Sequence, residues 1–194
     1  AAAAGIAVVA TGGCGGVHRG GATTLDISAD LDELARTPMV VVCSGPKSIL
    51  DIDLTLEYLE TRGVPIVGWG TTELAGFYSA GSGRMLAAAV DDASEVARLY
   101  RQQRALGLAA AIVVAVPVPA AAALPRAEAD AAIERAISEA QRAGVSGPRS
   151  TPWVLARVAA LTEGRSVSAN LALIENNARV AGAIAEALAT WGRG

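Results

Sequence analysis

The sequence predicts an α/β protein: a three-layer α/β/α fold with a mixed, largely parallel sheet and a helical C-terminal segment. One observation is the alternation of short, apolar, β-branched runs with helical patterns up to residue 116. A second is that residues 126–192 are mostly helical in pattern. The third is composition, since 52% of the 194 residues are hydrophobic but only 4% are aromatic. Such a chain suits a single domain, residues 1–194, with a core of Ala, Val, Leu and Ile.

Five apolar runs are expected to form strands. Each is short, mostly apolar and bounded by Gly, Pro or polar residues, as is typical of strands that are buried on both faces. The expected strands are 6–11, 40–43, 64–68, 85–90 and 109–116. The first begins so near the start of the chain that we interpret it as an inner strand of a longer sheet. Residues 74–83 are expected to form an irregular loop or an edge strand.

Six helical patterns lie between and after these runs. They span residues 31–36, 49–60, 92–106, 128–143, 152–162 and 166–191. Asp30 is a plausible N-cap of the first, and Pro152 is expected at the first position of the fifth. Asn176 and Asn177 fall in the middle of the last helix. Because Asn is disfavoured there, one that lies on a buried face needs a hydrogen-bond partner.

Lys47 is the first candidate for chemistry. It follows the apolar run 40–43, where α/β proteins hold reactive side chains, and it is the only lysine in a chain whose other cationic side chains are arginines. Lysine can lose its proton near neutral pH and arginine cannot, and only a neutral amine attacks a carbonyl to form a Schiff base. Lys47 is therefore a candidate nucleophile. The alternative is a lysine that merely binds an anion.

A glycine-rich loop, residues 11–24, separates the first strand from the first helix. Its six glycines allow backbone N–H groups to approach a ligand, and Thr11, His18 and Arg19 add side-chain donors, so phosphate is a suitable ligand. The loop is neither a P-loop nor a dinucleotide-binding fingerprint, because the residues that define those motifs are missing. The alternative is a sharply turning loop without a ligand.

Asp26, Ser28 and Asp30 alternate, so in an extended segment their oxygen atoms would point to one side. Oxygen ligands of this kind suit hard cations such as Mg²⁺ and Mn²⁺. The simpler interpretation of Asp30 is the helix cap described above.

Charge and hydropathy exclude several classes of partner. A net charge of −3 without a basic stripe argues against a nucleic-acid polymer. The sequence has no apolar run of membrane-spanning length and no signal-peptide pattern, so we expect a cytoplasmic protein without a membrane partner. Cys14 and Cys43 lack redox or metal-ligand spacing and are expected to be small buried residues without chemistry.

Several motifs together resemble the pseudouridine-5′-phosphate glycosidase family, whose relatives include indigoidine synthase A-like proteins. The resemblance covers essentially the whole chain in order. The residues that carry it are Thr11-Gly12-Gly13-Cys14-Gly15-Gly16-Val17-His18-Arg19-Gly20, Thr23-Thr24-Leu25-Asp26-Ile27-Ser28-Ala29-Asp30-Leu31, Lys47-Ser48-Ile49-Leu50-Asp51, Glu57-Tyr58-Leu59-Glu60-Thr61, Ser150-Thr151-Pro152-Trp153, Asn170 and Asn176-Asn177.

The resemblance implies a reaction: reversible cleavage of the C–C glycosidic bond of pseudouridine 5′-phosphate, which gives uracil and ribose 5-phosphate. It further implies Lys47 as the nucleophile, Asn170 as an assisting catalytic residue, Asp26 as a ligand of Mn²⁺ or another divalent cation, and Ser28-Ala29-Asp30 as substrate contacts. A homotrimer is expected on the same ground. An imine on lysine suits this bond, because a C-glycoside has no leaving oxygen for paired carboxylates to protonate.

Members of the family also carry an N-terminal portion with a glutamate general acid and a further lysine, and neither has a counterpart in this sequence. We therefore expect the 194-residue chain alone to bind a phosphosugar but to turn over poorly. The alternatives are an inactive protein or subunit that binds metal and sugar phosphate, and another Schiff-base lyase that acts on a phosphosugar.

Overall fold

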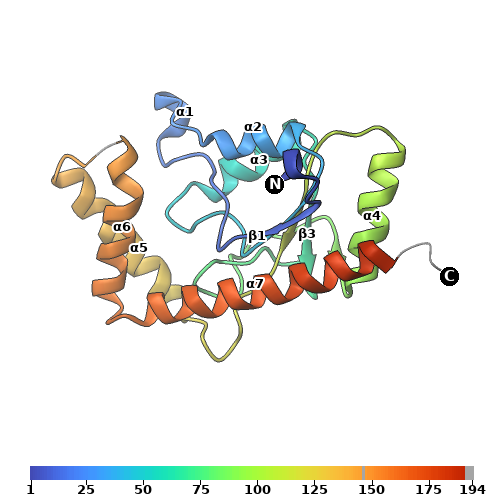
Figure 1. Cartoon of the computed structure of the whole chain (residues 1–194). Coiled ribbons are helices and arrows are strands. Elements are labelled where there is room, and N and C mark those ends of the chain that lie inside the picture. Colours follow the sequence, from blue (N-terminus) through green and yellow to red (C-terminus); the bar gives the residue numbers. More distant parts are fainter. Residues whose placement is uncertain (146, 191–194) are drawn as a thin grey trace.

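The computed structural model describes residues 1–145 and 147–190 and has an α/β architecture (Figure 1). Its five strands are β1 (Val8–Ala10), β2 (Val40–Cys43), β3 (Ile66–Trp69), β4 (Ala89–Val90) and β5 (Ile112–Ala115). They form one sheet in the order β1-β2-β5-β3-β4, and every neighbouring pair is parallel. Antiparallel pairing within the described residues is limited to isolated bridges. The predicted α/β class with a largely parallel sheet is confirmed.

The central strands β2 and β5 explain why the sheet forms. All four residues of each strand are buried, and Val41 of β2 lies opposite Val113 of β5. Each strand is almost wholly β-branched, which suits a strand that contacts helices on both faces.

Helices cover both faces of this sheet. On one face, α2 (Ala29–Arg36) and α3 (Ile52–Thr61) bury Leu31 and Leu59 against side chains of β2 and β5. On the other, α4 (Ala93–Ala105) and α7 (Arg165–Thr190) bury Val96 and Ile184 against the alternate residues of the same strands. Figure 1 shows α7, orange to red, running along one side of the molecule from α6 to α4. The predicted three layers are therefore present.

A further apolar cluster lies beyond the carboxyl ends of the strands. There α5 (Arg126–Arg142) and α6 (Ser150–Leu161) pack on each other, on the first half of α7 and on the loops after β2, β3 and β5. Arg157 and Arg135 hold the Glu139 carboxylate between these helices and lower the pKa of Glu139 to about 2. The predicted helical C-terminal segment is confirmed as far as Thr190, and residues 191 and 192 lie outside the described residues. Three short elements complete the chain: η1 (Ala2–Ala4), α1 (Gly21–Thr24) and η2 (Gly147–Arg149).

Two helix starts differ from the sequence-based prediction because side chains cap them elsewhere. Helix α2 begins at Ala29, since Ser28 is its N-cap and accepts the backbone N–H of Asp30 at 3.3 Å; the prediction that Asp30 caps it was wrong. Helix α3 begins at Ile52 rather than at residue 49, since Asp51 accepts the N–H of Leu54 at 3.0 Å. In both cases the cap satisfies a first-turn donor and sets the boundary.

Two further boundaries were also predicted wrongly. Helix α6 begins at Ser150, so Pro152 is its third residue rather than its first. A proline is tolerated there because first-turn N–H groups have no partner within the helix. The run 85–90 contributes only the two residues of β4, and Met85 is exposed and bridges Glu73 in the preceding loop.

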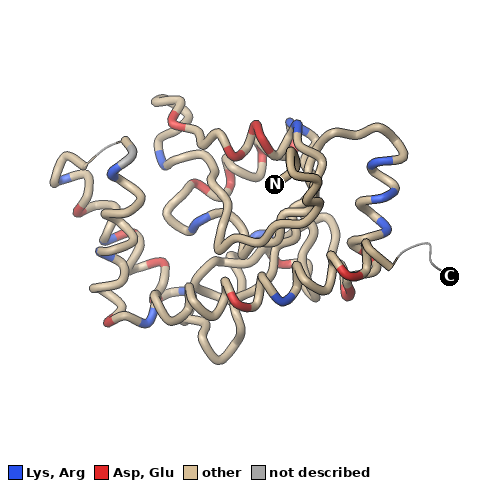
Figure 2. The backbone as a smooth tube through the Cα atoms, in the orientation of Figure 1, with Lys and Arg blue, Asp and Glu red and all other residues tan. Residues whose placement is uncertain are grey.

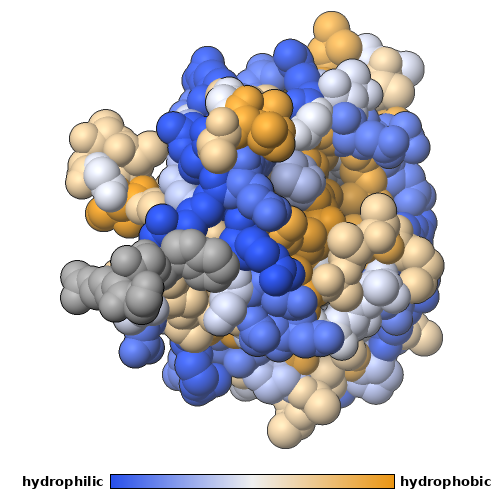
Figure 3. All heavy atoms as spheres, turned by 90° about the vertical axis from the view of Figure 1, so that its right-hand side faces the viewer, coloured by the Kyte–Doolittle hydropathy of each residue, from blue (hydrophilic) through white to orange (hydrophobic). Residues whose placement is uncertain are grey.

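The surface is mixed in charge. Figure 2 shows acidic and basic residues interspersed over most of the backbone, with a short basic row on α4. Beside α4 lies an apolar groove of about 630 Å³ that includes Leu99, Leu106 and Leu108, and Figure 3, which faces this side, shows a hollow of apolar atoms next to hydrophilic surface. Among residues 1–145 and 147–190, no helix combines the length and apolar character that a membrane crossing requires.

Leucine truncation tests the inferred core. Leu59 is 1% exposed between α3 and the sheet, whereas Leu106 is 75% exposed after α4. We expect Leu59→Ala to lower the free energy of unfolding by about 2–5 kcal/mol, through lost apolar burial and the cavity left behind. The matched change Leu106→Ala should stay within about 0.5 kcal/mol. Urea denaturation followed by circular dichroism measures both, and equal losses would contradict this packing.

Candidate functional site

The site is organised by two loops that remain paired after their strands end. We call residues 11–24 the glycine-rich loop and residues 44–51 the lysine loop. Ser44 N–H donates to Gly12 O at 2.9 Å, Cys14 N–H donates to Gly45 O at 3.1 Å, and Lys47 N–H donates to Cys14 O at 3.1 Å. The backbone of Lys47 is thus held by the glycine-rich loop, in a continuation of the β1–β2 pairing.

A cavity of about 260 Å³ opens between the glycine-rich loop, the lysine loop and α2. Lys47, Thr11 and Asp30 line it, so the fold brings together three residues that the sequence singled out, from three different segments. Cys14 forms part of the wall. Contact with the Cys43 thiol, together with burial, raises the pKa of Cys14 well above its ordinary value. Cys14 is therefore a neutral thiol, in keeping with the buried, unreactive role that the sequence suggests.

Asp30 is held against the glycine-rich loop by a close backbone contact. Its Oδ2 accepts the N–H of Gly15 at 2.7 Å, and Ser28 N–H donates to Gly16 O at 3.0 Å. A Cβ at Gly15 would lie 2.1 Å from Ser28 Oγ and 2.8 Å from Asp30 Oδ2. Only glycine therefore allows residues 28–30 to approach the loop this closely.

Asp26 and His18 form a separate pair outside the cavity lining. His18 N–H donates to Asp26 O at 2.9 Å, and His18 Nδ1 lies 4.0 Å from Asp26 Oδ2, whose side chain is 57% exposed. The predicted alternation of Asp26, Ser28 and Asp30 on one side of an extended segment was wrong, because Asp30 is already in the first turn of α2. Within the described residues no group of three or more His, Cys, Asp or Glu side chains could hold a metal ion.

Arg19 is directed elsewhere, into a second, polar cavity of about 450 Å³ that lies between α3, α5 and the loop after β3. It forms an ion pair with Glu134 of α5. Ser48, the neighbour of Lys47, also lines this cavity, and its buried Oγ has no hydrogen-bond partner within the described part of the chain.

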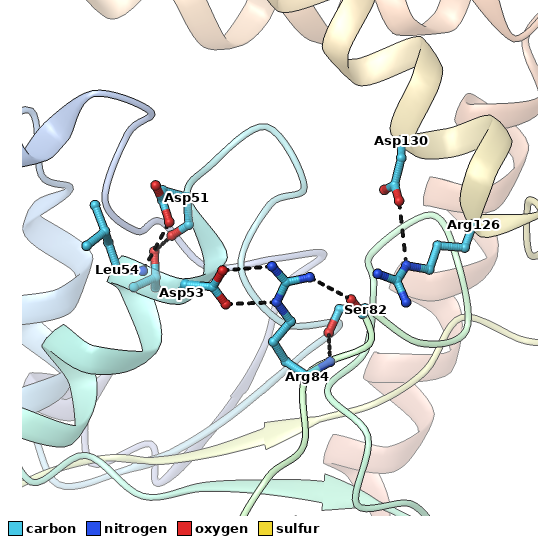
Figure 4. A network of polar contacts seen from close by, with 8 residues as sticks. Asp51, Asp53, Leu54, Ser82, Arg84, Arg126 and Asp130 are labelled. Atoms are coloured by element: carbon cyan, nitrogen blue, oxygen red, sulfur yellow. Dashed lines mark hydrogen bonds and ion pairs between the residues drawn. The ribbon is translucent and has the colours of Figure 1, made fainter.

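The other arginines of this polar cavity are paired as well. Figure 4 shows Arg84 forming two hydrogen bonds to Asp53, at 2.8 and 2.7 Å, and Arg126 facing Asp130 at 3.5 Å. The hydrogen bonds from Arg84 lower the pKa of Asp53. Carboxylates thus balance the positive charge of the arginines. The cavity therefore has no excess positive charge with which to bind an anion.

Asn170 reaches the glycine-rich loop from α7. Its Oδ1 lies 3.3 Å from the position that a Cβ on Gly12 would occupy, so the absence of a side chain at Gly12 lets α7 pack closely on the loop. Asn170 does not line the cavity of Lys47, but Thr11 and Gly13, the two neighbours of Gly12, do.

Asn177 is the buried asparagine of α7 for which the sequence predicts a need for a partner but no particular role. Asn177 is completely buried, and its Nδ2 donates to Thr11 O at 2.8 Å. The unfavourable position of Asn in the middle of a helix was the available signal.

Comparison with known proteins decides the family. The family model described as "Indigoidine synthase A like protein" matches residues 1–187. The chain belongs to this family. The resemblance inferred from the motifs is therefore confirmed at the level of the family.

Curated relatives of this indigoidine synthase A-like chain carry the name pseudouridine-5′-phosphate glycosidase. The protein from Cupriavidus pinatubonensis is 52% identical over 194 residues, which is 100% of this chain and 62% of the relative. The protein from Methylobacterium nodulans is 53% identical over 185 residues, which is 95% of this chain and 55% of the relative. The chain thus spans less than two thirds of the length of these curated relatives.

Solved structures share the same fold. The prealnumycin C-glycosynthase AlnA, in complex with ribulose 5-phosphate, matches with a TM-score of 0.91 and 36% identity over 97% of this chain and 62% of that one. An indigoidine synthase A-like protein from Thermotoga maritima matches with a TM-score of 0.85 and 39% identity, over 94% of this chain and 60% of that one.

Alanine at Gly15 tests the contact that holds residues 28–30. We expect Gly15→Ala to lower the free energy of unfolding by about 1–3 kcal/mol, because the new Cβ overlaps Ser28 and Asp30. Gly182→Ala is the matched control: nothing lies within 4 Å of its added Cβ in α7, so it should stabilise by about 0.5–1 kcal/mol. Denaturant titrations compare the two, and a neutral Gly15→Ala would contradict the close approach.

Proposed function

We propose that this chain contributes the nucleophile and part of the substrate site of a pseudouridine-5′-phosphate glycosidase. The reaction would cleave the bond between C1 of the ribose and the uracil carbon, giving uracil and ribose 5-phosphate. The observation that carries the proposal is the placement of Lys47, the sole lysine, in a cavity with Thr11 and Asp30. The names of the curated relatives support the same reaction.

The proposed chemistry follows from the need to break a carbon–carbon bond. The Lys47 amine attacks C1 and displaces the ring oxygen, which takes up the proton that the amine loses as the sugar ring opens. Its nitrogen lone pair then forms the imine while the bond from C1 to uracil breaks, and the uracil carbon takes up a proton. Water hydrolyses the imine, which releases ribose 5-phosphate and restores the amine. A lysine imine suits this step, because a C-glycoside has no leaving oxygen for paired carboxylates to protonate.

The remaining predicted residues have proposed roles around this step. Ser28, Ala29 and Asp30 would contact the sugar phosphate beside Lys47, and Thr11 lies on the same cavity. Arg19 would bind substrate only by exchanging its Glu134 partner. Asn170 would assist at the C1 atom from the α7 side of the glycine-rich loop.

A divalent cation, Mn²⁺ in the first instance, is proposed at Asp26. Asp26 with His18 provides an oxygen and a nitrogen donor within 4.0 Å of each other. Such a pair suits a cation that keeps several waters and completes its coordination with substrate phosphate. The cation would offset negative charge on the substrate. The proposal also includes a cytoplasmic homotrimer, which rests on the family resemblance.

A second candidate is a different Schiff-base lyase acting on a phosphosugar. It is favoured by AlnA, a structural relative whose crystal complex contains ribulose 5-phosphate. This activity would use Lys47 in the same way but would not require uracil.

Borohydride trapping tests the nucleophile. With ribose 5-phosphate, reduction should leave one sugar per chain on the peptide that contains Lys47, as measured by mass spectrometry. Lys47→Arg should abolish this adduct, because guanidinium does not form the imine. As a control, Arg104→Lys places a second lysine at an exposed position of α4. The sugar adduct should still form at Lys47. Adducts found only on the N-terminal amine would contradict the proposal. Because poor turnover is expected of this chain alone, any release of uracil from pseudouridine 5′-phosphate above the uncatalysed rate, followed by absorbance, favours the glycosidase over the second candidate.

Calorimetric titration with Mn²⁺ tests the metal site. Asp26→Asn should weaken binding because it removes a charged oxygen ligand. Asp91→Asn, at an exposed carboxylate before α4, should leave the affinity unchanged. The proposal fails if Asp26→Asn and the unmodified protein bind the ion equally well.

A further inference from the structure

Asn177 is a buried polar residue that joins three segments of the fold. It lies in the middle of α7 with 0% of its surface exposed. A polar amide in this position is unfavourable unless its donors and acceptors are paired. Asn177 therefore needs hydrogen bonds that offset the lost hydration of its amide. Its partners come from two loops.

One set of partners comes from the start of the glycine-rich loop. Asn177 Nδ2 donates to Thr11 O at 2.8 Å and lies 3.4 Å from Gly12 O. The other partner is Ser44, the first residue of the lysine loop, which is itself fully buried. Its Oγ lies 3.2 Å from Asn177 Nδ2 and 3.3 Å from Asn177 Oδ1.

These contacts meet where the two loops are already bonded to each other. Gly12 O, which lies near the Asn177 amide, also accepts the N–H of Ser44 at 2.9 Å. Beyond this point the loops stay paired through Cys14 and Gly45, and then through Lys47 and Cys14. The Asn177 side chain of α7 thus contacts both loops at the edge of the sheet where β1 and β2 end and the Lys47 cavity begins.

Asn177 also lies on the same face of α7 as Asn170. The two are seven residues apart, which is close to two helical turns, and Asn170 packs on Gly12. Helix α7 therefore contacts the glycine-rich loop through two amides. The Asn170 amide packs on Gly12, and the buried Asn177 amide donates to Thr11 O.

We propose that Asn177 is a positioning residue, which fixes the register of the glycine-rich loop against the lysine loop and so holds Lys47 opposite Thr11. The effect on imine formation rests on the proposed function, whereas the effect on loop register does not. Asparagine suits the position because it offers donors to carbonyl oxygens and an acceptor to the Ser44 hydroxyl. Leucine, of similar shape, offers neither, and aspartate would place a negative charge against carbonyl oxygens.

Amide hydrogen exchange tests the register directly. In Asn177→Leu, exchange at the N–H groups of Cys14, Ser44 and Lys47 should accelerate by at least about tenfold, since the bonds that protect them loosen. Exchange at Val113 of β5, whose N–H donates to the O atom of Pro65 just before β3, should change much less. The matched control is Asn176→Leu, at a neighbouring asparagine whose Nδ2 lies 3.4 Å from Pro117 O and whose side chain has no hydrogen bond to either loop end within the described residues. It should leave all of these amides unchanged.

The rate of borohydride trapping supplies the second measurement. It should fall at saturating ribose 5-phosphate in Asn177→Leu and not in Asn176→Leu. If Asn177→Leu does not fold, Ser44→Ala removes only the hydroxyl and should give a smaller acceleration confined to the same loop amides. Uniform acceleration over the whole chain, or unchanged loop exchange in a folded variant, would overturn the proposal. Loop acceleration in a protein that never traps sugar would uphold the positioning role and refute the proposed function.

Discussion

The parallel pairing of β1 with β2, continued into the loops that follow them, is the constraint on which the rest of the site depends. Parallel strands end at the same edge of a sheet, so the glycine-rich loop and the lysine loop leave the sheet side by side. Their backbone bonds then determine where Lys47 can lie. A lysine on a free loop would sample many positions, whereas the N–H of this lysine is bonded to Cys14 O at 3.1 Å.

Close approach of backbone to backbone explains the glycines of the first loop. Gly15 brings the loop against Ser28 and Asp30, and Gly12 brings it against Asn170 of α7. A side chain at Gly15 would occupy space that Ser28 already fills, and one at Gly12 would make a tight contact with Asn170. These glycines therefore serve close packing, and the same loop lines the Lys47 cavity through Thr11, Gly13 and Cys14.

Two cavities with different character flank the lysine loop. The one that contains Lys47 is lined by the glycine-rich loop and α2, and the other is polar and contains arginines paired with carboxylates. Lys47 lies in the first and its neighbour Ser48 in the second. The short lysine loop thus separates the two cavities.

Local pattern in the sequence was enough to determine the fold class and the place of Lys47 after a buried strand. The apolar runs of β2 and β5 and the helical periodicity after residue 126 depend on neighbours in the chain, and the position of Lys47 after a buried strand follows from them. Only the tertiary structure decided the partners of the site residues. Arg19 pairs with Glu134, 115 residues away, and Asn177 meets Thr11, 166 residues away. No local periodicity encodes such contacts, because they depend on how helices pack around the completed sheet.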